Sequence, residues 1–324
     1  MTGLLSVTDL RVGFATDDGL VQAVDGVSFE VGAGEILAIV GESGCGKSVT
    51  AQTLIGLTRS PNATITGSVM FGDADLSTLP DEALRRIRGE HIAMVFQDPM
   101  TSLNPVYRVG DQIAEAIRAH RHVSSSEAIA RAVTLLGEVG IPDAKRRVRD
   151  YPHEFSGGMR QRVMIAMALA LQPQLLIADE PTTALDVTIQ AQILDLLRTL
   201  NTERGVSILL ITHDLGVVAE LAEKVVVMYA GQIVEQSTVD ELFHRPQHPY
   251  TQGLLRSIPR LDEPRPTRLP QIAGQPPSLL APPAGCRFAA RCDRAFTDCL
   301  APPPLAGVDG HMTRCWIPGA EALR

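Results

Sequence analysis

Short apolar runs recur along this chain and alternate with stretches of helical periodicity. The runs are rich in β-branched residues and lie at 36–40, 92–96, 175–178, 208–212 and 225–229. Because they are apolar on both faces, they predict strands buried in a mostly parallel sheet. Helices are predicted at 47–57, 110–119, 126–139, 160–171, 187–203 and 214–222. This alternation predicts an α/β sheet with helices on both faces.

Two further regions depart from that pattern. Apolar and polar residues alternate in "LLSVTDLRVGF" and "AVDGVSFEV", near the N-terminus, which predicts half-exposed antiparallel strands in a small β layer. Residues 100–160 are mostly helical in pattern and interrupt the strand series, so they form a predicted helical insert. No internal repeat is visible. We therefore expect one nucleotide-type domain over residues 1–240.

The composition changes after about residue 241. "HRPQHPYTQGLL" opens a proline-rich stretch that includes "LDEPRPTRLP" and "GQPPSLLAPPAG". Proline at this density disfavours long helices and central strands. Residues 241–324 are predicted to form an extended arm that ends in a knob with four cysteines. Disorder is the alternative for such a composition.

Bulk properties narrow the class of protein. The 324 residues are 45% hydrophobic and 20% charged, with a net charge of −8. This balance offers no general attraction to nucleic acid or anionic lipid. The N-terminus lacks the basic and apolar regions of a signal peptide, and the longest apolar runs fall short of the roughly 20 residues that span a bilayer. We expect a cytosolic protein that reaches a membrane through a partner.

The segment "GESGCGKS" at 41–48 fits the pattern G-x-x-x-x-G-K-[ST] between a predicted strand and a predicted helix. Its backbone N–H groups would converge on phosphate oxygens at a helix N-terminus. Lys47 would reach the β- and γ-phosphates, and the Ser48 hydroxyl would bind Mg²⁺. Cys45 is interpreted as a small spacer rather than a nucleophile. The predicted nucleotide-binding residues of this loop are Gly41, Ser43, Gly44, Cys45, Gly46, Lys47 and Ser48.

Other polar residues follow the remaining strands. "LLIADEP" ends in Asp179, a candidate for the Mg²⁺ shell, and Glu180, a candidate general base for an attacking water. Gln97 follows another strand, where its amide could contact Mg²⁺ or the water. His213 follows a third, where it could bond the γ-phosphate. Singly, Gln97 and His213 would more often be polar strand caps. Together with "FSGGMRQR" at 155–162, a second helix start suited to an anion, they form a specific set.

In this order, over about residues 1–240, these motifs resemble an ABC-transporter ATPase with a P-loop NTPase core. The resemblance implies that two ATPase domains enclose two ATP molecules, so that this chain needs a second one. It implies that Ser156, Gly157 and Gly158 serve nucleotide bound mainly by the opposite subunit. It also implies that Asp186 lies at the seam and that Phe14 stacks on adenine. Met159 departs from the family, which usually has glutamine there, and little loss is expected.

Two segments resemble one importer subclass. "FQDPMTSLNPVYRVGDQIAE" at 96–115 and "RPQHPYTQGLL" at 245–255 are similar to importers of di- and oligopeptides, with nickel carriers as close relatives. The resemblance implies a homologous but different ATPase partner, two permease subunits and, indirectly, an extracytoplasmic binding protein. The coupling helix of the permease would meet the helical insert beside Gln97. His244 and His248 are interpreted as surface imidazoles on a rigid turn, with metal ligation as the alternative.

Cys286, Cys292, Cys299 and Cys315 are spaced C-x5-C-x6-C-x15-C. In a reducing cytosol, four thiolates suit tetrahedral Zn²⁺ or a [4Fe–4S] cluster better than disulfides, although disulfides and free thiols stay open. The absence of C-x2-C knuckles favours the cluster, and the resemblance implies one in some relatives. Such a cluster would fold a knob poor in apolar residues. Arg287, Arg291 and Arg294 would then offset the thiolates, or form a solvated basic face.

The sequence therefore predicts a Mg²⁺-dependent ATPase that drives peptide import as a dimer, bound peripherally at the cytoplasmic face of the membrane. Nickel or another small solute is the alternative cargo. A soluble ABC ATPase acting on nucleic acid or ribosomes is disfavoured, because the chain is acidic and carries one ATPase domain. A module that binds ATP without hydrolysing it would lack Glu180 or His213, and both are present.

Overall fold

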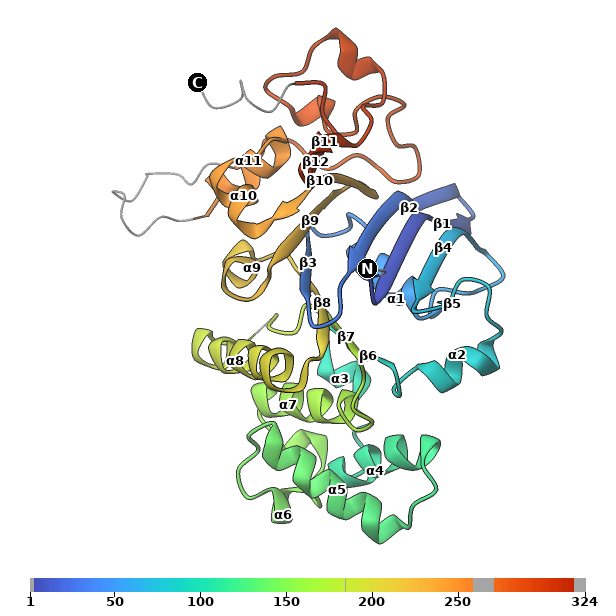
Figure 1. Cartoon of the computed structure of the whole chain (residues 1–324), viewed down its shortest axis with the longest axis vertical. Coiled ribbons are helices and arrows are strands. Elements are labelled where there is room, and N and C mark those ends of the chain that lie inside the picture. The colour runs from blue at the N-terminus through green and yellow to red at the C-terminus, as the bar shows by residue number, and fades with distance from the viewer. Residues whose placement is uncertain (1–2, 184, 259–270, 318–324) are drawn as a thin grey trace. The chain divides into compact units, whose positions relative to one another are not determined.

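The computed structural model describes residues 3–183, 185–258 and 271–317. The chain divides into two compact units (Figure 1). The first unit comprises residues 1–30, 37–77 and 212–324, and the second comprises 31–36 and 78–211. Both units mix strands and helices, so the predicted α/β class is correct.

Buried parallel strands form the centre of the first unit. Strand β3 (Ile36–Val40) pairs in parallel with β9 (Lys224–Tyr229), from Leu37 opposite Lys224 to Val40 opposite Val227. All five residues of β3 are buried. Burial on both faces explains why these strands read as continuous apolar runs. The helices of this unit are α1 (Lys47–Leu54), α9 (Leu215–Leu221), α10 (Val239–His244) and α11 (Pro249–Arg256).

The second unit repeats this arrangement with three strands. Strand β7 (Leu175–Asp179) lies between β6 (Ile92–Val95) and β8 (Ser207–Thr212), parallel to both. The five predicted parallel strands of the chain thus agree with the structure to within a residue or two. Helix α8 (Val187–Arg204) has Asp186 as its N-cap and Gly205 as its C-cap. The φ of +65° at Gly205 suits a helix C-terminus.

An antiparallel sheet in the first unit confirms the predicted β layer. Its order is β2-β1-β4-β5, formed by β1 (Leu5–Thr16), β2 (Gly19–Val31), β4 (Ala63–Phe71) and β5 (Ala74–Asp75). The sequence analysis did not predict β4 or β5. In β4 only Val69 is buried, because polar and small residues such as Thr64, Thr66 and Ser68 fill most of the strand. Its apolar signal is therefore weak.

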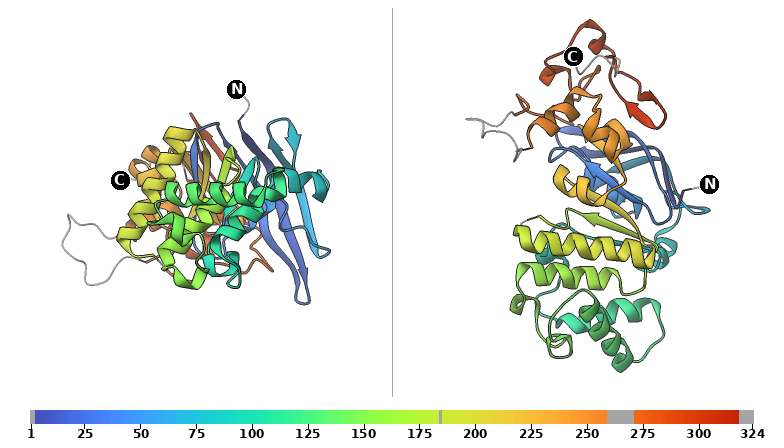
Figure 2. Two further views of the ribbon diagram at one scale, coloured as in Figure 1. Left: turned by 90° about the horizontal axis from the view of Figure 1, so that it is seen from below. Right: turned by 60° about the vertical axis from the view of Figure 1, so that its left-hand side comes forward.

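Helices fill the middle of the second unit, as predicted. Helices α4, α5 and α7 contact one another and form a helical group (Figures 1 and 2). Helix α7 starts three residues before the predicted 160, because the Ser156 side chain caps it. The short α2 was not predicted. The elements are α2 (Asp81–Ile87), α3 (Pro99–Ser102), α4 (Val109–His120), α5 (Ser125–Glu138), α6 (Ala144–Arg147), η1 (Pro152–Glu154) and α7 (Gly157–Ala168).

The C-terminal knob, residues 271–317, contains short elements, as its prolines predict. They are η2 (Ala289–Arg291), η3 (Thr297–Leu300), β11 (Ala306–Val308) and β12 (His311–Thr313). Strand β12 pairs with β10 (Gln232–Thr238), which also pairs with β9. The proline-rich segment 261–270 lies outside the described residues.

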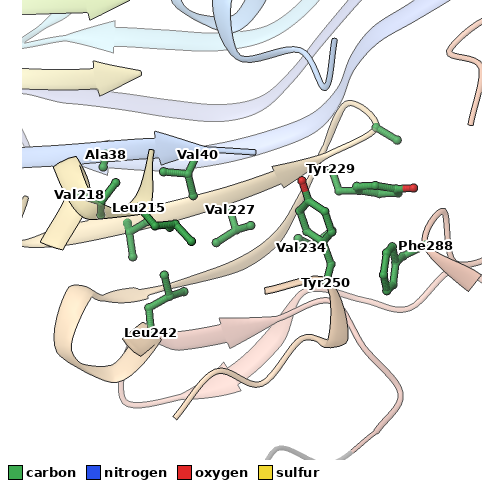
Figure 3. Packing of buried hydrophobic residues seen from close by; sticks show 12 residues of the cluster. Ala38, Val40, Leu215, Val218, Val227, Tyr229, Val234, Leu242, Tyr250 and Phe288 are labelled. Carbon is green, nitrogen blue, oxygen red and sulfur yellow. The ribbon is translucent and has the colours of Figure 1, made fainter. Parts of the chain in front are cut away.

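The knob packs on the core of the first unit. Phe288 joins a buried cluster with Tyr229 of β9, Tyr250 of α11 and the apolar residues of β3 (Figure 3). The ring centroids of Tyr229 and Phe288 are 5.3 Å apart, with the planes at 88°. Edge-to-face contacts of this kind are favourable beyond the area they bury.

Candidate active site

The loop at 41–48 joins β3 to α1, the strand–loop–helix context that the motif requires. A Cβ atom on Gly41, at φ +154°, would lie 2.2 Å from the Met228 carbonyl oxygen. One on Gly46, at φ +103°, would lie 2.4 Å from the Ala23 carbonyl oxygen. Only glycine fits at these two positions, because the loop runs against the backbones of β9 and β2.

Lys47 is held inside this loop. Its side chain is bent back, so that Nζ donates to the carbonyl oxygens of Gly41 at 2.7 Å and Glu42 at 3.1 Å. Ser43 and Gly44 are exposed at the tip, and Ser48 is half-buried in the first turn of α1. The ammonium group therefore faces the ring of backbone that a phosphate would enter.

Cys45 is buried at the base of the loop. Burial raises the pKa of its thiol, which keeps it protonated at neutral pH. Its carbonyl oxygen accepts a hydrogen bond from the Gly231 N–H at 2.9 Å. These contacts fit a spacer and argue against a nucleophile.

Two other predicted residues belong to the same unit. Phe14 is half-buried on β1, where it pairs with Ala63 of β4. His213 is exposed between β8 and α9. Asp214, the next residue, caps α9 by accepting the Gly216 N–H at 2.7 Å.

The predicted carboxylates lie at the end of β7 in the second unit. Asp179 and Glu180 are both buried, Glu180 with only 9% of its surface exposed. Glu180 has a φ of +48°, a left-handed conformation that a non-glycine residue adopts at a cost of about 1–3 kcal/mol. Its N–H donates to the Ile211 carbonyl oxygen at 2.8 Å, which holds the peptide in place. Such strain is typical of functional sites.

The Glu180 carboxylate is oriented by two neighbours. Gln97 Nε2 donates to Oε2 at 2.9 Å, and Thr183 Oγ1 donates to the same oxygen at 2.8 Å. The structure thus brings Gln97 and Glu180 together. Thr183 was missed by the sequence analysis as a partner of Glu180; its position three residues later in "DEPTT" was the available signal.

The segment "FSGGMRQR" starts helix α7. The Ser156 Oγ accepts the Met159 N–H at 3.3 Å. A Cβ on Gly158 would lie 2.4 Å from Ile189 Cγ2 of α8, whereas one on Gly157 would meet nothing closer than 4.0 Å. Gly158 therefore allows α7 and α8 to pack closely, and Gly157 leaves the helix start open to an anion.

Asp186 caps α8 by accepting the Ile189 N–H at 3.0 Å. The adjoining Val187 is exposed. The motif "TALD" includes Ala184, which lies outside the described residues. Asp186 thus has a structural role in its own chain besides the one implied by resemblance.

The predicted iron–sulfur or zinc site at the four C-terminal cysteines finds no support among the described residues. Within residues 3–183, 185–258 and 271–317, no three His, Cys, Asp or Glu side chains form a group that could hold a metal ion. The pKa of Cys286, Cys292 and Cys315 is raised by burial first and also by other cysteines of the set, so these thiols influence one another. The prediction that the knob needs a cluster as its core is not supported, because Phe288 packs into the core of the ATPase unit instead.

The arginines of the knob correct a second prediction. Arg287 pairs with Asp25 at 2.5 Å and Arg291 with Glu42 at 2.6 Å. Both side chains are buried, so they neither offset thiolates nor form a solvated face. Long-range carboxylates on β2 and the phosphate loop attract them, which the local sequence does not reveal.

The histidine prediction was half right. His244 is exposed at the end of α10. His248 is buried, and its Nδ1 accepts the Tyr250 N–H at 3.1 Å, so that it caps α11. Burial lowers the pKa of His248 to about 4 and keeps the ring neutral.

A phosphate loop after a buried strand, and a strained carboxylate after a parallel strand, define an ATPase of the P-loop class. Comparison with known families agrees. The model described as "ABC transporter" matches residues 24–183, and "Oligopeptide/dipeptide transporter, C-terminal region" matches 234–299. Among the described residues, no helix has the length and apolar character to cross a membrane.

Similar proteins extend over nearly the whole chain. The dipeptide transport ATP-binding protein DppD of Bacillus subtilis is 52% identical, with 99% of this chain and 97% of that protein aligned. The oligopeptide transport ATP-binding protein OppD of Escherichia coli is 51% identical, over 99% and 95%. A dimeric post-hydrolysis structure of the ATP-binding cassette MJ0796 with ADP and Pi has a TM-score of 0.65 at 28% identity, covering 72% of this chain and 98% of that one. The chain belongs to the family of ABC-transporter ATP-binding subunits, and it is an ABC ATPase.

Proposed function

We propose that this protein hydrolyses ATP to drive the import of di- or oligopeptides. The observation that carries the proposal is the Glu180 carboxylate, buried beyond β7 and oriented by Gln97 and Thr183. The names of the relatives support the peptide cargo. Nickel or another small solute is the alternative cargo. The domains we propose are the ATPase at 1–240, with its helical insert at 100–160, and the extension at 241–324.

Glu180 acts as the general base. It accepts a proton from water as the water oxygen attacks the γ-phosphorus, while the bond from that phosphorus to the β–γ bridging oxygen breaks. The products are ADP and inorganic phosphate. Gln97 and Thr183 fix the carboxylate, so the base does not need to reorient during the reaction.

The nucleotide is held by the phosphate loop, with Lys47 on the β- and γ-phosphates, His213 on the γ-phosphate and Phe14 on the adenine. Mg²⁺ would be held by Ser48, Gln97 and Asp179, whose hydroxyl, amide and carboxylate oxygens are the donors this ion prefers. Bound Mg²⁺ neutralises charge on the phosphates.

The active form is a dimer with a second, homologous ATPase chain. Ser156, Gly157 and Gly158 complete the site around nucleotide bound by the partner, and Asp186 lies at the seam. The exposed Val187 and the open start of α7 support this face as the contact. The dimeric state described for MJ0796 supports it further.

Two permease subunits anchor the dimer at the cytoplasmic face of the membrane, and an extracytoplasmic binding protein acts indirectly. Met100, Val106 and Tyr107 are exposed apolar residues that follow Gln97 in the chain. We assign these exposed apolar side chains to the contact with the permease. Because Gln97 bonds Glu180, docking at this surface is coupled to the base.

The test is Glu180→Gln. We expect it to retain ATP binding and to reduce turnover by about 10³-fold, because the proton acceptor is lost. Lys47→Ala is the control, and it should lose binding itself. Fluorescent-nucleotide titration and phosphate release measure the two properties. Hydrolysis by E180Q at the wild-type rate would contradict the assigned base. If the wild-type rate of hydrolysis per chain does not depend on protein concentration, the dimer is contradicted.

A further inference from the structure

Glu42, the second residue of the phosphate loop, is bound by the C-terminal knob. Arg291 Nη1 donates to Glu42 Oε2 at 2.6 Å, and Nη2 donates to Oε1 at 3.0 Å. This is a two-pronged guanidinium–carboxylate pair, the strongest and most directional kind of side-chain ion pair. The partners are 249 residues apart in the chain.

A second contact reaches the backbone of the same residue. The Glu42 N–H donates to Tyr250 Oη at 2.9 Å. Tyr250 belongs to α11 and is fully buried, with its ring 4.7 Å from that of Tyr229 and 5.4 Å from that of Phe288. Figure 3 shows the Tyr250 side chain beside those of Tyr229 and Phe288, so its hydroxyl is fixed in position, and the hydrogen bond holds the Glu42 N–H with it.

Glu42 in turn holds the loop. Its carbonyl oxygen accepts from Lys47 Nζ at 3.1 Å and from the Cys45 N–H at 3.3 Å. Side chain, N–H and carbonyl of this one residue are thus all engaged. A shift of Glu42 would move the carbonyl that orients Lys47.

Arg291 is a rigid support for this contact. Its Nε donates to the Ala273 carbonyl oxygen at 3.0 Å, and its Nη2 also reaches the Ile272 carbonyl oxygen at 3.3 Å. The guanidinium carbon lies 5.7 Å from the centre of the Tyr229 ring. The side chain is 5% exposed, and the bond to Glu42 is the largest cause of its raised pKa. It stays charged at every physiological pH.

We propose that Arg291 is a positioning residue for ATP binding: through Glu42 it holds the phosphate loop in the shape that receives nucleotide. The inference rests on the proposed function, since it concerns the same loop. Arg291 acts on the loop and does not touch the nucleotide itself. Loss of the guanidinium leaves a half-buried carboxylate without its main partner, which drives Glu42 toward water and displaces its peptide.

The test compares Arg291→Met with Glu42→Gln and with the double variant R291M/E42Q in the full-length chain. We expect R291M to raise the KM for ATP and the Kd for a fluorescent ATP analogue about tenfold, as for the loss of one charged hydrogen-bonded pair. The kcat at saturating ATP should change less than about twofold, because Glu180 is untouched. The double variant should bind no more weakly than the weaker single one, since Arg291 acts only through Glu42.

Arg314→Met is the matched control. Arg314 belongs to the same knob, is half-buried and donates to the Ile233 and Pro303 carbonyl oxygens, away from the loop. It should lower thermal stability but leave the Kd within about twofold of wild type. If R291M does not fold, Arg291→Lys supplies the measurement, because it keeps the charge and loses the two-pronged geometry.

Wild-type affinity in R291M, equal losses in R291M and R314M, or additive losses in the double variant would each overturn the proposal. The proposed function fails separately. If the wild-type chain does not bind the ATP analogue, or K47A binds it equally well, the loop is not the nucleotide site at all.

Discussion

The strand core and the C-terminal knob are held together by different interactions. Strands β3 and β9 are buried runs of Ile, Leu, Ala and Val that pair in parallel. Among its described residues, the knob contributes one large buried apolar side chain, Phe288, and it also reaches the same unit through partly buried apolar residues, the pairing of β12 with β10, and arginines. Apolar burial supplies most of the free energy of folding, and ion pairs with fixed geometry supply orientation.

This difference shows how the proline-rich knob becomes ordered without a core of its own. The knob uses the core of the ATPase unit through Phe288 and binds its carboxylates through Arg287 and Arg291. Because these carboxylates lie on β2 and on the phosphate loop, the knob is positioned to affect nucleotide binding.

The largest effect is expected at Phe288, the large apolar side chain of the knob that is buried in the shared core. Phe288→Ala should lower the free energy of unfolding by about 3–5 kcal/mol, as for a large aromatic residue removed from a core. Phe296→Ala is the matched control in the same knob; its side chain is 43% exposed, against 3% for Phe288. It should change stability by less than about 0.5 kcal/mol. Urea denaturation measures both, and equal losses would show that the knob has no single anchor.

A smaller effect is expected from His248 as the pH falls. Its pKa is about 4 in the folded chain, where burial is the main cause, and 6.5 as the ordinary value. Between these values the unfolded state binds a proton that the folded state does not, so acid favours unfolding. The contribution of the neutral His248 ring to the free energy of unfolding is fully present above about pH 6.5. This contribution falls by ~3 kcal/mol as the pH decreases to about 4.

His248→Asn tests this titration while leaving the nearby pair of Glu235 and His311, 2.7 Å apart, in place. Asparagine can still accept the Tyr250 N–H as a helix cap but has no proton to gain. The free energy of unfolding, measured from denaturation curves between pH 7 and pH 4.5, should therefore decrease less with falling pH in H248N than in wild type. Parallel dependences would exclude His248 as the titrating group.

The smallest effect is expected at two helix N-caps, one in each compact unit. Thr238 caps α10 by accepting the Glu241 N–H at 3.3 Å, and Ser124 caps α5 by accepting the Glu127 N–H at 3.2 Å. Thr238→Ala and Ser124→Ala should each cost about 1 kcal/mol in the free energy of unfolding. Chemical denaturation checks this, with Ser125→Ala, at the neighbouring exposed serine, as a control. A much larger loss for Thr238 would mean that polar contacts stabilise the C-terminal part more than its packing does.

The sequence by itself determined the parallel strands, the main helices, the phosphate loop and the carboxylate after β7. Local periodicity or a short motif indicates each of these features. For Gly41 and Glu180, the residue type at that position of the motif is itself the signal. The sequence pattern missed β4, whose polar composition hides its strand, and it did not reveal that Phe288 of the cysteine-bearing knob packs into the core of the ATPase unit.

The partners of Arg287, Arg291 and His248 are determined by the tertiary structure and not by the local sequence. Arginine beside cysteine looks locally like a counter-charge, and histidine between prolines looks like a surface turn. Their actual partners are Asp25, Glu42 and a buried helix start, two of them more than 240 residues away. The free energy of such contacts depends on burial and on distance in space, and neither quantity appears in a local pattern.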